Sequence, residues 1–192
     1  MKVIAFNGSA REKGNTYTLL ATVLERIEAA SIKTELIWLG NKPLGGCMAC
    51  YKCLKNKDAR CAQNDIINHY FRMMLDADGI ILGSPTYFAD VSSNMKALIE
   101  RCGMVSRVNG DLLKRKAGAA VVAVRRAGAY HVFSSLNSFF LIGQMIVVGS
   151  SYWNLGRGKD PGEVKDDHEG MKTMKDLGDN MAWLIKKLKN EG

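Results

Sequence analysis

Residues 2–17 read KVIAFNGSAREKGNTY, and this stretch indicates the fold more strongly than any other part of the chain. Residues 2–6 are an apolar run long enough for one buried strand. The small and polar residues 7–14 predict a tight turn. Asn15 is a favourable N-cap, and the apolar residues behind it recur at helical spacing. The stretch therefore predicts a strand, a glycine-containing loop and the start of a helix.

This loop offers groups that could bind a phosphate monoester. Backbone N–H groups that are free at a helix N-terminus attract anions. Ser9, Thr16 and Tyr17 add hydroxyls, and Arg11 adds a guanidinium with a fixed fork of donors. The loop has neither the Gly-Lys-Ser/Thr ending of a Walker loop nor the glycine spacing of a dinucleotide fingerprint. An ordinary strand-to-helix loop with a normal cap is the alternative.

Length and composition are those of one globular domain. The chain has 192 residues, of which 47% are hydrophobic, so a single sizeable core can be buried. Its apolar runs are shorter than the roughly 18 residues of a membrane span, and the first residues do not have the pattern of a signal peptide. We therefore expect a cytoplasmic protein that does not bind membranes.

The net charge of +8 suits an anionic cofactor, an acidic protein partner or nucleic acid. The basic residues are spread along the chain, and no nucleic-acid-binding module is present in the sequence. We therefore expect no nucleic-acid partner, and a basic solvated surface is the simplest interpretation of the charge.

Four further apolar runs predict strands, at residues 33–39, 79–83, 117–124 and 145–148. Helical spacing predicts helices at residues 16–30, 64–76, 92–102, 132–142 and 171–188, with an irregular stretch at 150–167. Buried strands that alternate with helices predict a parallel, doubly wound α/β sheet. Ligands bind such sheets beyond the carboxyl ends of the strands. The loops at 7–15, 84–90 and 125–129 should therefore converge.

The second and third of these loops carry groups that suit a planar heteroaromatic ligand. Pro85 stiffens one turn, and Tyr87 and Phe88 provide aromatic rings beside it. Arg125 and Arg126 bring two cations to the other loop. The alternatives are aromatic residues that only cover the edge of the core and arginines that are simply solvated.

The residues quoted above form a pattern that resembles a known family. Residues 8–16 (GSAREKGNT), 83–88 (GSPTYF) and 96–101 (KALIER) are similar to the flavodoxin-like NAD(P)H-dependent FMN reductases. This resemblance extends over essentially the whole chain. It implies a three-layer α/β/α sandwich with a five-stranded parallel sheet of order 2-1-3-4-5, and an FMN-dependent oxidoreductase whose chemistry takes place on the flavin.

The resemblance also implies three groups of FMN contacts. The FMN phosphate would be held by Ser9, Arg11, Asn15 and Thr16, with the hydroxyl of Tyr17 beside them. The isoalloxazine would be lined by Pro85, Thr86, Tyr87 and Phe88. The third contact region would be Arg126, Ala127 and Gly128, where relatives tend to be richer in glycine.

Four of the five cysteines lie in an insertion at about residues 43–63 of this single domain. Cys47, Cys50 and Cys53 are separated by two residues each, and seven residues separate Cys53 from Cys61. Two-residue gaps let one loop supply three thiolates to a [4Fe–4S] cluster. Zinc usually takes two separated pairs of cysteines, and free or redox-active thiols are a further alternative. Cys102 lies on a predicted helix, where a core residue is expected.

With these cysteines the chain resembles, more narrowly, the iron–sulfur flavoproteins of the family. That resemblance implies electron transfer between FMN and a [4Fe–4S] cluster, with NAD(P)H or ferredoxin as redox partner, in a homodimer or homotetramer. One alternative is an NAD(P)H-dependent FMN or quinone reductase without metal, and another is a non-enzymatic redox carrier. A zinc-stabilised binding module without flavin is a third. Positive charge around the cysteines, at Lys52, Lys55, Lys57 and Arg60, suggests a surface that docks an acidic carrier such as ferredoxin.

Overall fold

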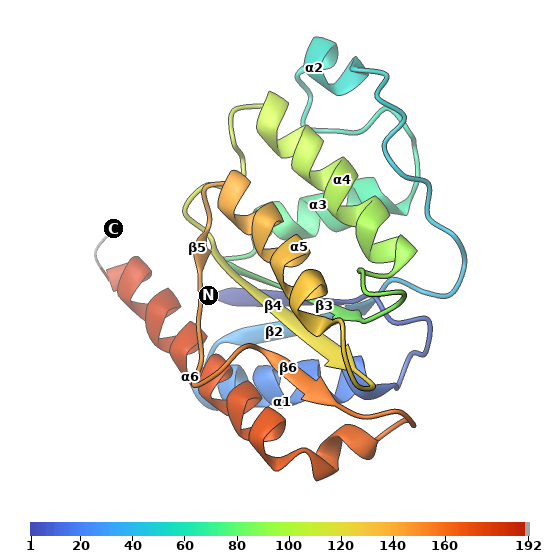
Figure 1. Ribbon diagram of the computed structural model, residues 1–192. Helices are drawn as coiled ribbons and strands as arrows, with labels where there is room; N and C mark the ends of the chain where they lie inside the picture. The colour runs from blue at the N-terminus through green and yellow to red at the C-terminus, as the bar shows by residue number, and fades with distance from the viewer. Residues whose placement is uncertain (191–192) are drawn as a thin grey trace.

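The computed structural model describes residues 1–190 of the chain. Its elements alternate in the predicted way (Figure 1). The strands are β1 (Lys2–Asn7), β2 (Lys33–Trp38), β3 (Gly79–Pro85), β4 (Ala117–Val124), β5 (Ile146–Val147) and β6 (Leu155–Arg157). The helices are α1 (Asn15–Ala29), α2 (Lys52–Asn56), α3 (Ile66–Asp76), α4 (Ser93–Val108), α5 (Ala129–Ile142) and α6 (His168–Asn190), with a 3-10 helix, η1, at Glu163–Asp166.

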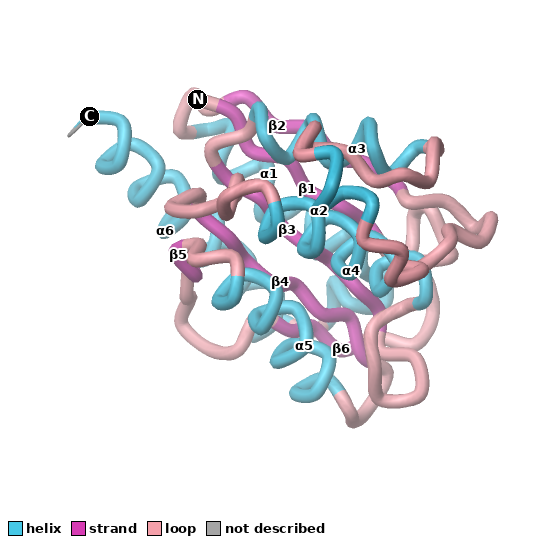
Figure 2. Tube along the Cα trace, turned by 90° about the horizontal axis from the view of Figure 1, so that it is seen from above, coloured by secondary structure: helices cyan, strands magenta, loops and turns pink. Residues whose placement is uncertain are grey.

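The strands form one parallel sheet of order β2-β1-β3-β4-β5, which confirms the predicted topology. Every residue of β3 and β4 is buried, as expected for strands that are covered on both faces. Figure 2 shows the sheet as a middle layer with helices on either side. The arrangement is the three-layer α/β/α sandwich that the sequence predicts.

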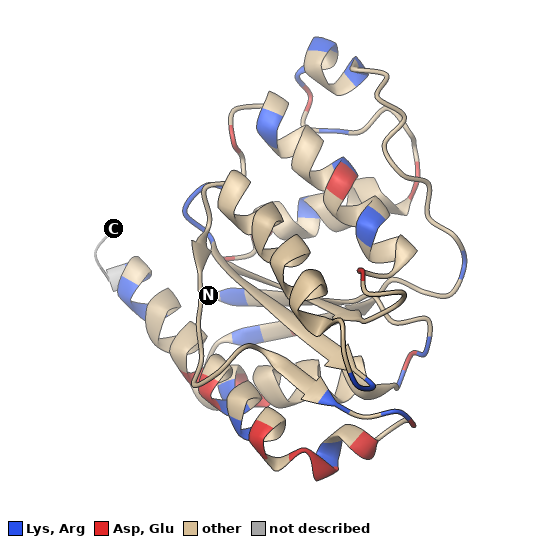
Figure 3. Cartoon of the chain, in the orientation of Figure 1, with Lys and Arg blue, Asp and Glu red and all other residues tan. Residues whose placement is uncertain are grey.

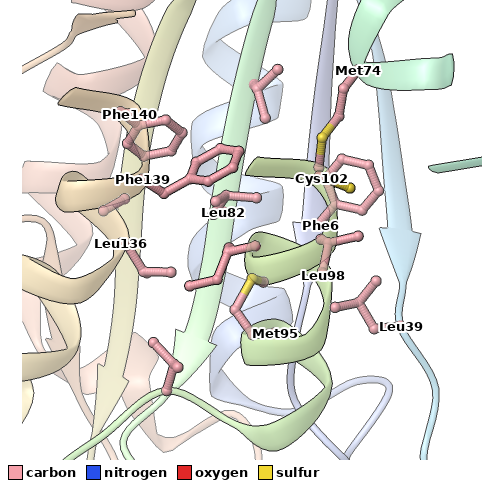
Figure 4. Close-up of a cluster of buried hydrophobic side chains, with 14 of the residues drawn as sticks. Phe6, Leu39, Met74, Leu82, Met95, Leu98, Cys102, Leu136, Phe139 and Phe140 are labelled. Carbon is pink, nitrogen blue, oxygen red and sulfur yellow. The ribbon is translucent and has the colours of Figure 1, made fainter. Parts of the chain in front are cut away.

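Two hydrophobic clusters hold the layers together, one on each face of the sheet. Figure 4 shows part of the first, where Phe6 and Leu82 on the strands pack with Leu98 on α4 and Leu136 on α5. The second joins the opposite face to α1 and α6. The helices approach the strands closely there, since a Cβ added at Gly83 would lie 2.6 Å from Leu20 Cδ1.

The outer edge of the sheet differs from the prediction. β5 pairs with the beginning of β4, at Ala117 and Gly118, and the additional strand β6 pairs with its end, at residues 122–124. Residues 155–157 were expected to be irregular because they form a short segment beside a glycine-rich stretch. The backbone of β4 supplies the hydrogen bonds that make them a strand.

Helix boundaries also differ, and α5 and α6 each begin three residues earlier than predicted. α4 runs on to Val108 instead of ending near Cys102, because Val105 is buried and its packing outweighs the low helix propensity of Gly103. α1 begins at Asn15 with Gly14 as its N-cap, so the predicted capping role of Asn15 is wrong. Asp65 caps α3 and Ser92 caps α4, since each side chain accepts a hydrogen bond from a backbone N–H of its own helix.

The cysteine segment, residues 43–63, extends beyond the sheet and contains the short helix α2. Figure 1 shows α2 at the tip of this segment, at the far end of α4. Within residues 1–190, no helix combines the length and the apolar character needed to cross a membrane.

Candidate functional site

The loops that follow β1, β3 and β4 meet at one cavity of about 250 Å³, as the fold predicts. We call it the sheet-edge cavity. From the predicted site, its walls contain Ser9, Arg11, Asn15, Thr16, Pro85, Thr86 and Tyr87. The remaining wall residues are Gly14, Ala123, Val124, Arg125, Gly158 and Lys159.

The first loop is built so that the N-terminus of α1 faces this cavity. No side chain caps the helix at Gly14, so the first N–H groups keep their capacity to donate. Ser9 is buried, its N–H donates to Asn7 Oδ1 at 3.0 Å, and its Oγ accepts from Arg11 N at 3.1 Å. Trp38 Nε1 donates to the Ser9 carbonyl at 2.7 Å. These contacts fix the loop in a form that can receive an anion.

Asn15 contacts the other end of the chain instead of its own helix. Its Oδ1 accepts hydrogen bonds from the N–H groups of Gly162 at 2.9 Å and Val164 at 3.4 Å. The side chain therefore ties α1 to the segment that follows β6. This segment also places Gly158 close to Asn15, where an added Cβ would lie 2.8 Å from Asn15 Nδ2.

The loop after β3 supplies a polar atom that has no partner. Thr86 Oγ1 is buried and makes no hydrogen bond. The backbone of Thr86 is held, because its N–H donates to the Ala123 carbonyl at 2.8 Å. A buried hydroxyl rarely lacks a hydrogen-bond partner in a native protein. Thr86 is therefore suited to form a hydrogen bond with a polar ligand atom in the cavity.

Phe88 and Tyr17 do not line the sheet-edge cavity. Tyr87 and Asp90 pair through two backbone hydrogen bonds of 3.0 Å, and the turn between them leaves Phe88 fully exposed. Tyr17 lies on a different hollow, of about 640 Å³, between α1 and α6. The structure therefore brings the Ser9, Thr16 and Thr86 hydroxyls together without that of Tyr17.

The loop after β4 reaches the cavity one residue earlier than predicted. Arg125 lines it, whereas Arg126, Ala127 and Gly128 do not. Gly128 has a φ of +88°, and a Cβ there would lie 3.2 Å from Thr86 Cγ2. Its role in the structure is to let the start of α5 pass closely over the loop after β3.

Gly158 and Lys159 also line the cavity, although the sequence pattern does not predict them there. They follow β6, and the Gly158 N–H donates to the Val124 carbonyl at 2.9 Å. The Lys159 carbonyl in turn accepts from Arg11 Nη1 at 3.4 Å. The alternation of glycine and basic residues at 156–159 was the available signal, since glycine in a strand indicates close backbone approach.

The four clustered cysteines lie around a second, much smaller apolar pocket of about 20 Å³. Cys47 and Cys50 are exposed, Cys61 is half-buried and Cys53 is buried. Burial raises the pKa of the Cys53 thiol. In the part of the chain that the structure describes, no three Cys, His, Asp or Glu side chains are grouped closely enough to hold a metal ion as they stand. Four thiols around one pocket are nevertheless the donor set that an iron–sulfur cluster requires.

Polar side chains of the neighbouring helices hold the cysteine segment. Asn94 on α4 accepts from Leu44 N at 3.0 Å, and Glu100 accepts from Cys47 N at 3.3 Å. Asn68 on α3 accepts from Cys61 N at 2.8 Å. Cys102 is buried in the core, as predicted, and burial raises the pKa of its thiol.

The outer surface of the segment is basic. Figure 3 shows lysines on α2, and Lys52, Lys55 and Arg60 beside the cysteines are exposed. Lys57 is anchored, since its ammonium donates to the Val108 carbonyl at the end of α4.

Comparison with known proteins identifies related sequences and similar folds. Residues 1–160 match the family described as NADPH-dependent FMN reductase. An iron–sulfur flavoprotein of Methanocaldococcus jannaschii is 38% identical over 195 residues, which cover 98% of this chain and all of the relative. An iron–sulfur flavoprotein of Methanosarcina thermophila is 29% identical over 187 residues, covering 96% and 95% of the two chains.

Solved structures show the same fold at lower identity. RosB, determined with a bound 8-demethyl-8-formylriboflavin-5'-phosphate, has a TM-score of 0.79 at 20% identity and covers 99% of this chain and 81% of its own. An NAD(P)H:quinone oxidoreductase of Methanothermobacter marburgensis has a TM-score of 0.68 at 13% identity, covering 94% and 96%. The fold, the converging loops and the family match agree with the resemblance seen in the sequence. The chain belongs to the NADPH-dependent FMN reductase family and is an FMN-dependent oxidoreductase.

Proposed function

We propose that the chain is an iron–sulfur flavoprotein, which binds FMN in the sheet-edge cavity and a [4Fe–4S] cluster at Cys47, Cys50, Cys53 and Cys61. The observation that carries this proposal is that all four cysteines line one pocket. The 38% identical relative, which is named an iron–sulfur flavoprotein, supports it. When bound, FMN would exchange electrons in pairs or singly and the cluster would exchange them singly, so the protein would pass electrons between the two.

The cavity walls suggest how FMN would be held. The phosphate would accept hydrogen bonds from the N-terminal amides of α1, including that of Asn15, and from Ser9 and Thr16. Arg11 would pair with the phosphate charge. At the other end, Pro85 and Tyr87 would contact the ring system, and Thr86 Oγ1 would gain the partner that it lacks.

The other predicted contacts are proposed in modified form. Arg125, which lines the cavity, would provide the contact that the sequence pattern places at Arg126–Gly128. Phe88 would act at the cavity rim, where its exposed ring is available to a second molecule. The Tyr17 hydroxyl would act only if FMN binding moved it toward the phosphate.

NAD(P)H and ferredoxin are the redox partners that we propose. The exposed Lys52, Lys55 and Arg60 would attract an acidic carrier to the cysteine segment. A copy carrying Lys52→Glu and Lys55→Glu should accept electrons from ferredoxin more slowly and with less dependence on salt. Equal rates and equal salt dependence in the two proteins would contradict this docking surface.

We also propose a homodimer or homotetramer in the cytoplasm. The exposed aromatic residues Tyr130, Tyr152 and Trp153, which pack against one another, would contribute to contact between copies. The cysteine segment and residues 156–167 are further candidates. Sedimentation of the purified protein tests this point, and a monomer at micromolar concentration would contradict it.

The central experiment is purification without oxygen, followed by absorption spectroscopy and analysis of iron, acid-labile sulfide and FMN. The expected result is about four irons per FMN. FMN without iron would contradict the cluster while leaving the flavin site in place. Cys102→Ala is the matched control, because this buried cysteine lies outside the pocket and its removal should leave the iron content unchanged.

An NAD(P)H-dependent FMN or quinone reductase without metal is the second candidate. The present spacing of the cysteine side chains, which does not group three of them around one ion, favours it. Protein purified without oxygen would then contain FMN without iron and would still oxidise NADPH. A large loss of NADPH oxidation on removal of iron would contradict this candidate.

A further inference from the structure

Arg101 on α4 is unusual because its charge is buried. Its guanidinium is 0% exposed, and within residues 1–190 Arg101 is the one charged residue that is buried. A charge removed from water destabilises the fold unless partners compensate for it. The hydrogen-bond partners of the Arg101 guanidinium therefore indicate its role.

All three nitrogens of the Arg101 guanidinium have partners. Nη1 and Nη2 donate to the two oxygens of Asp65 at 2.6 and 2.7 Å, in the bidentate geometry that suits arginine. Nη1 also donates to the Gly45 carbonyl at 3.2 Å, and Nη2 donates to the Gln63 carbonyl at 3.1 Å. Gly45 lies just before the first cysteine of the segment and Gln63 just after the last, so one side chain ties both ends of the segment to α4.

The remaining nitrogen points at a cysteine. Arg101 Nε donates to Cys61 Sγ at 3.3 Å, and Arg101 lines the same pocket as the four cysteines. Hydrogen bonds to the sulfurs of an iron–sulfur cluster, together with nearby positive charge, favour the reduced form of the cluster. Partners of this kind also fix the direction in which a ligand side chain points.

We propose that Arg101 is a positioning residue of the cysteine site, which orients Cys61 through the Nε–H···Sγ hydrogen bond and raises the reduction potential of the cluster. This inference rests on the proposed function, because it concerns a cluster held by these cysteines. Lysine cannot replace arginine here, because a single ammonium cannot contact Asp65 in bidentate fashion and also donate to Cys61 from a separate nitrogen.

The test compares Arg101→Lys with the parent protein. Arg107→Lys is the matched control, since Arg107 is also on α4 but is 53% exposed and pairs with Asp111. Each protein is purified without oxygen, its iron and FMN are measured, and the cluster is titrated while reduction is followed by electron paramagnetic resonance. Arg101→Lys should shift the cluster potential to more negative values, and Arg107→Lys should leave it unchanged.

A second measurement needs no variant that must fold. Parent protein labelled with ¹⁵N only at the Nε of arginine is reduced, and pulsed electron paramagnetic resonance is used to detect coupling between the cluster and that nitrogen. Coupling is expected because Nε would lie one hydrogen bond from a ligand sulfur. If Arg101→Lys loses its iron altogether, this measurement decides between the proposal and a purely structural role.

The possible failures are distinguishable. Parent protein that contains FMN but no iron would overturn the proposed function, and this inference with it. Parent protein with a cluster that shows no arginine coupling would overturn the inference alone. A cluster potential that Arg101→Lys leaves unchanged would also overturn the inference alone, since a merely structural arginine would affect stability without affecting the potential.

Discussion

The sheet-edge cavity and the cysteine segment are held in place by different kinds of contact. The cavity lies at the ends of β3 and β4, whose residues are all buried. Its loops form hydrogen bonds with the backbone of those strands. The cysteine segment is held mainly by side chains of α3 and α4. The first site is therefore built on the strands, whereas the second is held by helix side chains and packs Cys53 into the hydrophobic cluster on that face of the sheet.

Backbone conformation differs between the two regions in degree, since the loop after β3 has two non-glycine residues with positive φ, Phe88 and Ala89. The cysteine segment contains four non-glycine residues with positive φ, namely Ala49, Tyr51, Lys57 and Ala59. This conformation is unfavourable by roughly 1–2 kcal/mol for a residue with a side chain. A segment keeps such a backbone conformation only if surrounding contacts hold it in place. We therefore expect the two regions to respond differently to mutation.

The largest expected effect is the loss of metal without loss of flavin. Cys50→Ser removes one thiolate, and the iron content should fall to a small fraction of the parent value while FMN stays near one per chain. Iron and FMN analysis of protein purified without oxygen measures both. If iron and FMN were lost together, the two regions would not be independent.

Removal of the anchor should loosen the cysteine segment and leave the cavity intact. Asp65→Asn takes the carboxylate from the buried Arg101, which should lower the free energy of unfolding by about 2 kcal/mol, less than for a fully buried pair because Asp65 is 36% exposed. Denaturant unfolding measures this, and hydrogen exchange should increase in residues 43–63 alone. Equal exchange throughout the chain would contradict a local anchor.

The same pair predicts a dependence on pH. The hydrogen bond from Arg101 lowers the pKa of Asp65 from its ordinary value of 3.8. The stability it contributes is therefore complete above that value and is lost as the pH falls through the lower pKa of the folded protein. Hydrogen exchange of the segment should rise in this acid range in the parent, and Asp65→Asn should remove that step.

A smaller effect is expected in the cavity. Thr86→Val keeps the shape of the side chain and removes the hydroxyl that lacks a partner. FMN should bind about tenfold more weakly, because one hydrogen bond to the ligand is lost, while the free protein should be no less stable. Fluorescence titration with FMN and thermal unfolding measure the two. Thr34→Val on β2, away from the cavity, is the control, and equal affinity of Thr86→Val and the parent would contradict the contact.

The smallest effect concerns the tie between α1 and η1. Asn15→Ala removes an oxygen that accepts two backbone hydrogen bonds, so stability should fall by about 1 kcal/mol. Asn137→Ala provides the comparison, because Asn137 Oδ1 is buried without a partner. Denaturant unfolding measures the stability of both variants. Equal losses of stability in Asn15→Ala and Asn137→Ala would contradict this role of Asn15.

The parts of the fold that the sequence predicted well are those in which local pattern and burial agree. β4 has the predicted bounds because Ala117–Val124 is one continuous apolar run. β6 could not be predicted, since a segment of three residues with a central glycine has too little apolar pattern to indicate a strand. It forms a strand because it pairs with β4. The N-cap at Gly14 was missed because Asn15, a better capping residue, bonds to a loop that lies far away in the sequence.

The candidate site was predicted only in part, for a similar reason. Ser9, Thr16 and Thr86 follow predicted strands or begin a predicted helix, so the topology alone brings them together. Gly158 reaches the cavity through β6 and was therefore missed along with that strand. Arg101 did carry a signal, because it shares one helical face with Leu98, Cys102 and Val105, and a charged residue among apolar ones on that face must have a buried partner.

The division of the outer edge into β5 and β6 has a consequence for how this chain can vary. Each piece is fixed to β4 independently, one at Ala117–Gly118 and the other at Val122–Val124, and Val148 and Asn154 also bond to the backbone of β4, so the connection at residues 149–153 does not set the register of either. Its length can change while β6 still delivers Gly158 and Lys159 to the cavity. This connection is therefore a place where related chains can gain or lose residues without altering the cavity, and a residue inserted there would test whether Tyr152 and Trp153 contribute to contact between copies.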